Sequence, residues 1–321
     1  MTVRNLGKTL IIANPAAHSG KGEQAIPRLE RFFSLYQDVC ESIDIQTTAA
    51  PLDAVHLAAG ASEMDTVIVL GGDGVIHEAV NGLMSLDPEC RPTLGIVAMG
   101  TGNDFARTLG LSFNDPDSSL AELVAGKTRK IDLGLVSSDL PSEGSPINPQ
   151  ETYFVETLSF GMDAAIALDT TERREADAHK EGSGLFVSSS VKMALTNSSG
   201  HPCDVVIDDE RLWLNEVIFA IQNGPTYGGG FRICPDADPS DGLLDICYNT
   251  IRPPIPYLLN LLARARFGTH VSSPAVSLRK AKSIHLDFHG AQPPCQADGE
   301  RVVGTRFEVS IIPQALDVIF A

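Results

Sequence analysis

Paired cysteines, long apolar runs and tryptophan are all scarce in this chain of 321 residues. The six cysteines are scattered without a CxxC pair, which excludes the common zinc and redox motifs and indicates reduced thiols in a cytoplasmic protein. No run of about eighteen apolar residues occurs, and the apolar stretch near the start is too short for a signal peptide. We therefore expect a cytoplasmic protein whose contact with the inner face of a membrane is peripheral and transient.

Basic residues are also few. Lys and Arg number 24 against 41 Asp and Glu, so the formal net charge is −17. Nucleic-acid-binding proteins usually carry a basic surface, and this charge balance argues against that class and against broad attraction to anionic lipid. Apolar residues make up 43% of the chain and charged residues 20%, which is typical of a folded globular protein. The length predicts two domains.

Apolar strands alternate with helical segments over roughly the first 130 residues. Such alternation predicts βαβ units built around a parallel sheet. After this region the pattern changes to many short strands, with helices expected near residues 170–196 and 255–267. Trp213 alternates with leucines in one of these strands and is expected to pack inside. The helix near 255–267 is amphipathic and could touch a bilayer, but packing on the second lobe is the favoured interpretation.

Three strands of the first lobe each run into a glycine-rich loop: NPAAHSGKG, GGDGV and GTGND. Such loops emerge at the carboxyl ends of parallel strands, where ligands bind. Glycine lets backbone N–H groups approach an oxyanion, and a helix N-terminus adds partial positive charge. The loops therefore predict a polyphosphate site, with Asp73 and Asp104 at two of their tips. Asp73 could cap the following helix or join a metal–phosphate network.

None of these loops matches a standard nucleotide motif. The first lacks the Walker pattern GxxxxGK[ST]. In the second and third, His77 and Phe105 stand where the dinucleotide fingerprint needs its last glycine. His77 and Arg107 are expected on solvated faces of their helices.

The motifs resemble those of the diacylglycerol kinase catalytic domain family, whose superfamily includes sphingosine and ceramide kinases. GGDGVIHEAVNGL, MGTGNDFARTLGL and NPAAHSGKG are similar to its first-lobe signatures. YGGGFRICPDADPSDGLLDI and CQADGE are similar to its second-lobe signatures, and the five segments stand in family order. The resemblance implies a three-layer α/β nucleotide lobe at residues 1–131, joined by a returning strand at about 307–321. A β-sandwich lobe at 132–306 would follow, with the active site in the cleft between the lobes.

The resemblance implies that ATP is the phosphate donor and that Mg²⁺ accompanies it. The residues that it assigns to ATP binding come from four loops of the first lobe: Asn14, Pro15, Thr48, Gly71, Gly72, Asp73, Gly74, Val75, Thr101, Gly102, Asn103 and Asp104. It assigns a structural magnesium ion to the second lobe, held by Asp241 and by the backbone carbonyls of Asp238 and Leu243.

Catalysis is assigned to the acidic pair of the closing DGE motif, Asp298 and Glu300. An alcohol needs a carboxylate to accept its proton during phosphoryl transfer. Alone, the segment is also a good hairpin-turn signal, so Asp298 could be a turn residue. The longer side chain slightly favours Glu300 as the base.

Val75 replaces the threonine of the family's GGDGT motif and so removes a hydroxyl group that could bind phosphate. The favoured interpretation is an ATP-dependent lipid kinase that transfers the γ-phosphoryl group to diacylglycerol or a related lipid. Two alternatives stay open: a NAD kinase-like phosphotransferase, and a nucleotide-binding protein with weak or no kinase activity. The family's soluble members also suggest a homodimer.

Overall fold

The computed structural model describes residues 4–141, 150–176, 188–193 and 200–321, with no side chains described for 174–176. The chain divides into two compact units. Unit 1 comprises residues 1–131 and 314–321, and unit 2 comprises residues 132–313. The return to unit 1 begins a few residues later than the expected position of about 307.

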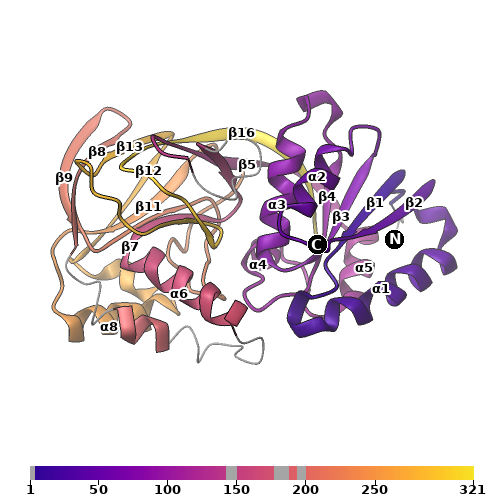
Figure 1. Ribbon diagram of the computed structural model, residues 1–321, viewed down its shortest axis with the longest axis horizontal. Coiled ribbons are helices and arrows are strands. Elements are labelled where there is room, and N and C mark those ends of the chain that lie inside the picture. The colour runs from indigo at the N-terminus through magenta and orange to yellow at the C-terminus, as the bar shows by residue number, and fades with distance from the viewer. Residues whose placement is uncertain (1–3, 142–149, 177–187, 194–199) are drawn as a thin grey trace. The chain divides into compact units, whose positions relative to one another are not determined.

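Unit 1 alternates strands and helices (Figure 1). Its elements in chain order are β1 (Lys8–Ala13), α1 (Ala17–Leu35), η1 (Gln37–Val39), β2 (Ser42–Thr47), α2 (Asp53–Ala59), β3 (Thr66–Gly71), α3 (Asp73–Met84), η2 (Pro88–Cys90), β4 (Thr93–Ala98), α4 (Asp104–Thr108) and α5 (Pro116–Ala125).

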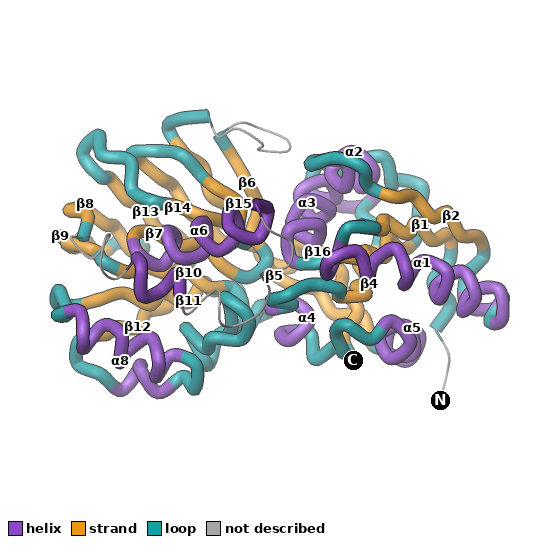
Figure 2. Tube along the Cα trace, turned by 60° about the horizontal axis from the view of Figure 1, so that its bottom comes forward, coloured by secondary structure: helices purple, strands orange, loops and turns teal. Residues whose placement is uncertain are grey.

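The strands of unit 1 pair in the order β2-β1-β3-β4, all parallel, and the end of the last strand of the chain, β16 (Arg306–Phe320), joins beside β4. Because β3 is buried along its whole length, both faces of the sheet must be covered. α1 and α5 pack together on one face, and α2 and α3 pack together on the other (Figure 2). The three-layer α/β architecture expected from the sequence is confirmed.

Unit 2 is built mainly from antiparallel strands. Its elements are β5 (Lys127–Ser138), which begins in unit 1, β6 (Glu151–Phe154), β7 (Thr157–Gly161), α6 (Met162–Ala176), β8 (His201–Ile207), β9 (Glu210–Glu216), β10 (Ile218–Gln222), β11 (Leu244–Asn249), α8 (Ile255–Ala265), η3 (Thr269–Ser272), β12 (Val276–Ala281), β13 (Ser283–Asp287), β14 (Cys295–Ala297), β15 (Glu300–Arg301) and the first part of β16.

Two sheets of unit 2 enclose one apolar core. One sheet has the order β12-β11-β10-β7-β14-β15, and the other contains β16, β13, β8 and β9. Phe160 of β7 meets Phe307 of β16 with ring centroids 4.9 Å apart, so residues of the two sheets face each other. Face-to-face packing of antiparallel sheets is the β-sandwich expected from the sequence.

Three expectations about single elements or residues were wrong. His77 is buried in α3, where the Asn81 amide lies 3.3 Å from its ring, instead of lying on a solvated face. Trp213 is 65% exposed on β9, because its side of the strand faces away from the core. Helix α5 was not among the predicted elements, although Asp115 caps it and Pro116 begins it.

The helix expected near 170–196 falls partly on residues 177–187 and 194–199, outside the described part of the chain. Its described part, α6, begins at Met162, directly after Gly161. Gly161 has φ +77°, a backbone conformation that lets β7 turn at once into the helix.

Candidate active site

The three glycine loops of unit 1 lie at one edge of its sheet. Each follows the carboxyl end of a parallel strand, and β1, β3 and β4 are direct neighbours. Backbone hydrogen bonds continue the pairing into the loops, from Asn14 N–H to Leu70 O and from Met99 N–H to Gly71 O. Thr48, at the end of β2, donates its N–H to Ala13 O and so extends the same edge.

Glycine at position 100 is required by backbone packing between two of the loops. A Cβ on Gly100 would lie 2.8 Å from the Cα of Gly72 and 2.9 Å from the Asn103 side chain. The second and third loops therefore touch through their backbones. Any side chain at Gly100 would push them apart.

Helix α3 begins directly at this contact. Gly72 is its N-cap residue and supplies no side-chain cap, and the first helical bond runs from Ile76 N–H to Gly72 O. The N–H groups of the first turn, including those of Gly74 and Val75, have no carbonyl partner within an α-helix. This twelve-residue helix therefore directs donors and partial positive charge toward the loops.

Asp73 joins two of the loops. It is the first helical residue of α3 and not its N-cap, so the capping alternative is wrong. One carboxylate oxygen accepts the N–H of Asn103 at 2.8 Å and would lie 2.6 Å from a Cβ on Gly102. Asp73 therefore helps to fix the shape of the GTGND loop.

Asn114 and His18 also support the loops, and sequence reasoning did not identify either residue. The Asn114 amide bonds both the N–H and the carbonyl of Gly100, each at 3.1 Å. His18, in the non-helical start of α1 that forms part of the first glycine loop, lies with Nδ1 2.8 Å from the Asn114 Oδ1 atom. His18, Ser19 and Gly20 all have positive φ values, a tight turn that the SGKG spacing alone does not reveal.

Val75 has a packing role in the second loop. A Cβ on Gly71 would lie 3.0 Å from the Val75 Cβ atom, so the branched side chain rests against the glycine. Threonine has nearly the same shape and would fit this space. The position therefore accepts either residue, and the difference between them is one hydroxyl group.

In unit 2, the DGE segment forms a tight hairpin between β14 and β15. Asp298 and Gly299 have φ values of +51° and +99°, which is the left-handed turn that Asp-Gly favours. The Asp298 carboxylate accepts the N–H groups of Val155, Glu156 and Thr157 at 2.7, 3.0 and 3.0 Å. It therefore fastens the hairpin to the turn between β6 and β7.

Glu300 differs from Asp298 in its surroundings. Its side chain is exposed on β15, whereas the neighbouring Arg301 pairs with Glu172 of α6 at 2.8 Å. Beneath the hairpin, buried Gln296 accepts the N–H of Gly299 and donates to Ser159. The structure thus supports the Glu300 backbone firmly and leaves its carboxylate open to solvent. Of the two acids, Glu300 therefore has the more accessible carboxylate.

A buried polar group that the sequence interpretation missed lies beside this hairpin. Asn223 donates to the carbonyls of Asp132 and Val155, both at 2.9 Å. The Asp132 carboxylate accepts the N–H of Gly242 at 2.7 Å. Buried Glu156 lies where a side chain on residue 224 would collide with it. In the sequence, the only indication that these polar residues are buried was their position next to apolar strands.

The predicted magnesium loop contains Asp238, Asp241 and Leu243. Asp241 accepts the N–H of Leu243 at 3.0 Å and the Lys280 ammonium group at 2.7 Å. Burial favours the neutral amine, but hydrogen bonds to Asp241 and Asp245 raise the pKa of Lys280 overall.

Within the described ranges, no three His, Cys, Asp or Glu side chains form a metal-binding group. A carboxylate and two carbonyls are oxygen donors that suit Mg²⁺. The residues therefore fit the ion in donor type, although it would share Asp241 with Lys280. The site stays a prediction.

Two further acids lie deep in unit 2. Burial raises the pKa of Asp163 to about 6. Hydrogen bonds from Tyr227 and Ser159 lower the pKa, but the effect of burial is larger. Burial also raises the pKa of Glu216 to about 7, although His201 Nδ1 lies 3.2 Å from its carboxylate. Both groups therefore favour the protonated form more than an exposed carboxyl group does.

Similarity to known proteins covers almost the whole chain. The family description "Diacylglycerol kinase catalytic domain" matches residues 8–136, and "YegS C-terminal NAD kinase beta sandwich-like domain" matches residues 156–320. A protein named diacylglycerol kinase from Mycobacterium tuberculosis is 32% identical over 319 residues, which cover 98% of this chain and 95% of that protein. The chain belongs to the diacylglycerol kinase family.

Other members of this family are more distant. A protein of Serratia proteamaculans named "Probable lipid kinase YegS-like" is 26% identical over 88% of this chain and 85% of its own length. A crystal structure of a diacylglycerol kinase from Bacillus anthracis superposes with a TM-score of 0.69 and 22% identity, covering 98% of this chain and 97% of that one. A second structure from that organism reaches a TM-score of 0.76. These structures support the fold.

Proposed function

We propose that this protein is an ATP-dependent lipid kinase that transfers the γ-phosphoryl group of ATP to a lipid hydroxyl group, with diacylglycerol as the first candidate acceptor. The observation that carries the proposal is the meeting of three glycine loops at the carboxyl ends of β1, β3 and β4. The family membership supports a phosphoryl-transfer reaction with a lipid acceptor.

Unit 1 is proposed to bind the triphosphate. Backbone N–H groups at the start of α3 and in the GTGND loop would surround the phosphate oxygens, with Asn14 and Thr48 at neighbouring strand ends. Magnesium, when bound with ATP, would neutralise the charge on the phosphates.

Unit 2 is proposed to activate the acceptor. A lipid hydroxyl group is a weak nucleophile, and a positioned carboxylate that accepts its proton typically contributes about 10²–10⁴-fold to the rate. We assign this role to Glu300 because its carboxylate is exposed on a rigid hairpin. The three N–H bonds to Asp298 make it a positioning residue, since those oxygens already hold the turn in place.

The test is incubation with γ-labelled ATP and a panel of acceptors that includes diacylglycerol, monoacylglycerol, sphingosine, ceramide and NAD. The proposal predicts label in the organic phase with one or more lipids and none in NAD. Label in NAD alone would support the NAD kinase alternative. ATP binding without transfer to any acceptor would support the alternative of a nucleotide-binding protein.

A further inference from the structure

One stretch of this acidic chain is entirely free of acids. Residues 246–286 contain no Asp or Glu, although acids outnumber bases 41 to 24 in the whole protein. The same stretch carries six basic residues: Arg252, Arg264, Arg266, Arg279, Lys280 and Lys282. It includes helix α8 and the loops at both of its ends. Arg279 pairs with Glu210, and Lys280 pairs with Asp241 and Asp245, so the basic charge of the stretch lies mainly on the residues around α8.

Helix α8 packs on unit 2 through one side only. Leu258, Leu261 and Ala265 are buried, and Leu258 belongs to a core cluster with Met162 and Ile166 of α6. Both views show α8 at the periphery of the unit beside α6 (Figures 1 and 2). The packing of this helix expected from the sequence is confirmed for its inner side.

The outer side of α8 carries an uncharged stripe. Pro256, Asn260 and Ala263 are exposed and are spaced by four and three residues, which places them on one face of the helix. Phe267 continues this spacing just beyond the helix end and is 76% exposed. Ile251, before the helix, is 56% exposed. Two large apolar side chains therefore stand at the two ends of an uncharged helical face.

Arginines surround the Phe267 end of this face. Arg264 bonds the Ser272 hydroxyl at 2.8 Å, and Arg266 bonds the carbonyl of Gly229 at 2.6 Å. Exposed Arg232 is held beside them, because its N–H donates to the carbonyl of Ala265. The nearest acid along this loop is Asp236, which follows Pro235 at the end of the cluster. Three arginines therefore lie near Phe267: Arg264 and Arg266 through the chain itself, and Arg232 through its backbone bond to Ala265.

We propose that this surface, the α8 face with Ile251, Phe267 and the flanking arginines, docks onto a bilayer that contains anionic phospholipid. Large apolar side chains that project from a surface, with basic residues around them and no acids, can insert into such an interface while the basic residues contact the anionic headgroups. Because the remainder of the chain is strongly acidic, the attraction must be local. The proposal rests on the proposed lipid kinase function and adds to it the surface that meets the membrane.

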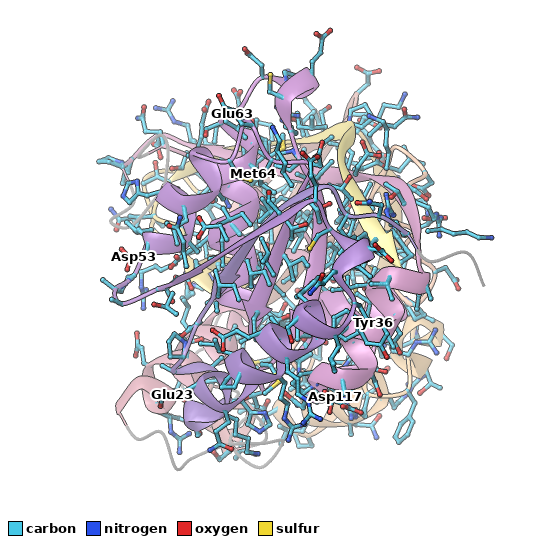
Figure 3. All side chains as sticks on the ribbon, turned by 90° about the vertical axis from the view of Figure 1, so that its right-hand side faces the viewer. Glu23, Tyr36, Asp53, Glu63, Met64 and Asp117 are labelled. Carbon is cyan, nitrogen blue, oxygen red and sulfur yellow. The ribbon has the colours of Figure 1, made fainter. Side chains whose placement is uncertain are left out.

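Other exposed aromatic residues lack this setting. Tyr36 of unit 1 is 56% exposed, on a face where Glu23, Glu63 and Asp117 also project (Figure 3). Trp213 is paired across β8 and β9 with Asp204. Neither residue lies in the acid-free stretch, so both serve as matched controls.

The test is sedimentation of the full chain with phosphatidylcholine vesicles, made with and without phosphatidylglycerol, in the absence of ATP. We expect binding to the anionic vesicles that weakens with salt. Ile251→Ser with Phe267→Ser should reduce partitioning by about tenfold or more, since each exposed side chain would otherwise be buried in the bilayer. Arg252→Gln should reduce it by about fivefold at low salt. Tyr36→Ser and Trp213→Ser should bind like the wild type.

Absence of wild-type binding, or equal loss in the control variants, would overturn the proposal. A change of oligomeric state in the double variant without a change in vesicle binding would also overturn it, because this surface would then be a contact between copies of the chain.

Phosphorylation of lipid in detergent micelles distinguishes a failure of the docking proposal from a failure of the proposed kinase function. If the double variant is active in micelles and also acts on vesicle-borne lipid as fast as wild type, the docking surface is wrong and the kinase stands. If no lipid is phosphorylated in micelles, the kinase is wrong, whatever the vesicles show.

Discussion

The two units present polar chemistry in opposite ways. In unit 1 the donors are backbone N–H groups, brought together by glycines whose loops touch without side chains between them. In unit 2 the chemistry lies in carboxylates, and backbone N–H groups hold one of them, Asp298, in place. Parallel strands place successive loops at one edge, whereas an antiparallel hairpin presents one turn at a time.

This difference predicts how each unit responds to substitution. A site made of backbone tolerates side-chain changes that leave the backbone in place, but fails when a Cβ separates the loops. A site made of carboxylates loses activity when an amide replaces one carboxylate, even where the fold is unchanged. The comparison can be tested by substitutions in both units.

The largest effect is expected at the hairpin. Glu300→Gln should lower kcat by about 10²–10⁴-fold because it removes the proton acceptor, with Tm unchanged since the side chain is exposed. Glu172→Gln, another exposed acid, is the control. Lipid phosphorylation and thermal melting are the measurements. A Glu300→Gln enzyme with near-normal kcat would remove this residue from the mechanism.

Asp298→Asn should lower both activity and stability. The variant retains one acceptor oxygen but loses the charge that three N–H groups bind, so Tm should fall by roughly 4–8 °C. Thermal melting compared with Glu300→Gln measures this contrast. An unchanged Tm would show that the three bonds contribute no stability, and Asp298 would then return as a candidate base.

Gly100→Ala should weaken ATP binding by about tenfold or more. Its Cβ would lie 2.8 Å from the Cα of Gly72, so the second and third loops must separate. Gly60→Ala, at the end of α2, meets only ordinary contacts at 3.6 Å and is the control. Calorimetric titration with ATP tests both variants, and equal affinities would mean that contact between the loops does not shape the site.

A pH-dependent contribution to stability is expected from Glu216. Burial raises its folded pKa to about 7, above the ordinary value of 4.5, so the folded state holds the proton more tightly than the unfolded chain does. The associated stability is present below pH 4.5 and is lost as pH rises through 7. Glu216→Gln should make Tm less dependent on pH between pH 4.5 and pH 7. A variant with the same slope as wild type would contradict the raised pKa.

The smallest effect is expected from Val75→Thr. The new hydroxyl group could add one hydrogen bond to phosphate, so ATP affinity should rise several-fold, to at most about tenfold. Packing against Gly71 should be preserved because the shapes match, and Tm should not change. Unchanged affinity would show that this departure from the family motif has no effect on ATP binding.

Sequence patterns predicted the features that depend on local order. Buried strands followed by glycine loops required only alternation along the chain, and the parallel sheet then placed the loops at one edge. The hairpin turn at the DGE segment was also predicted. The different surroundings of Asp298 and Glu300 were not predictable, because the donors to Asp298 come from residues 155–157, far away in the chain.

Burial was the least predictable property. His77 has a polar side chain on an amphipathic helix, yet Asn81 pairs with it inside the unit. Trp213 has the alternation of a half-buried strand, but its side of β9 faces solvent. In each case the outcome depends on which face the rest of the fold covers, and spacing along the chain does not contain that information.

The lipid kinase assignment is tested most directly by the lipids of cells that express the protein. Lipids would be extracted from cells that produce the wild type or Glu300→Gln at equal levels, and phosphate esters would be compared by mass spectrometry. The account predicts a phosphorylated lipid, phosphatidic acid or a related ester, that accumulates with wild type and not with the variant. Identical lipid profiles, from cells in which both proteins are folded and bind ATP, would contradict it.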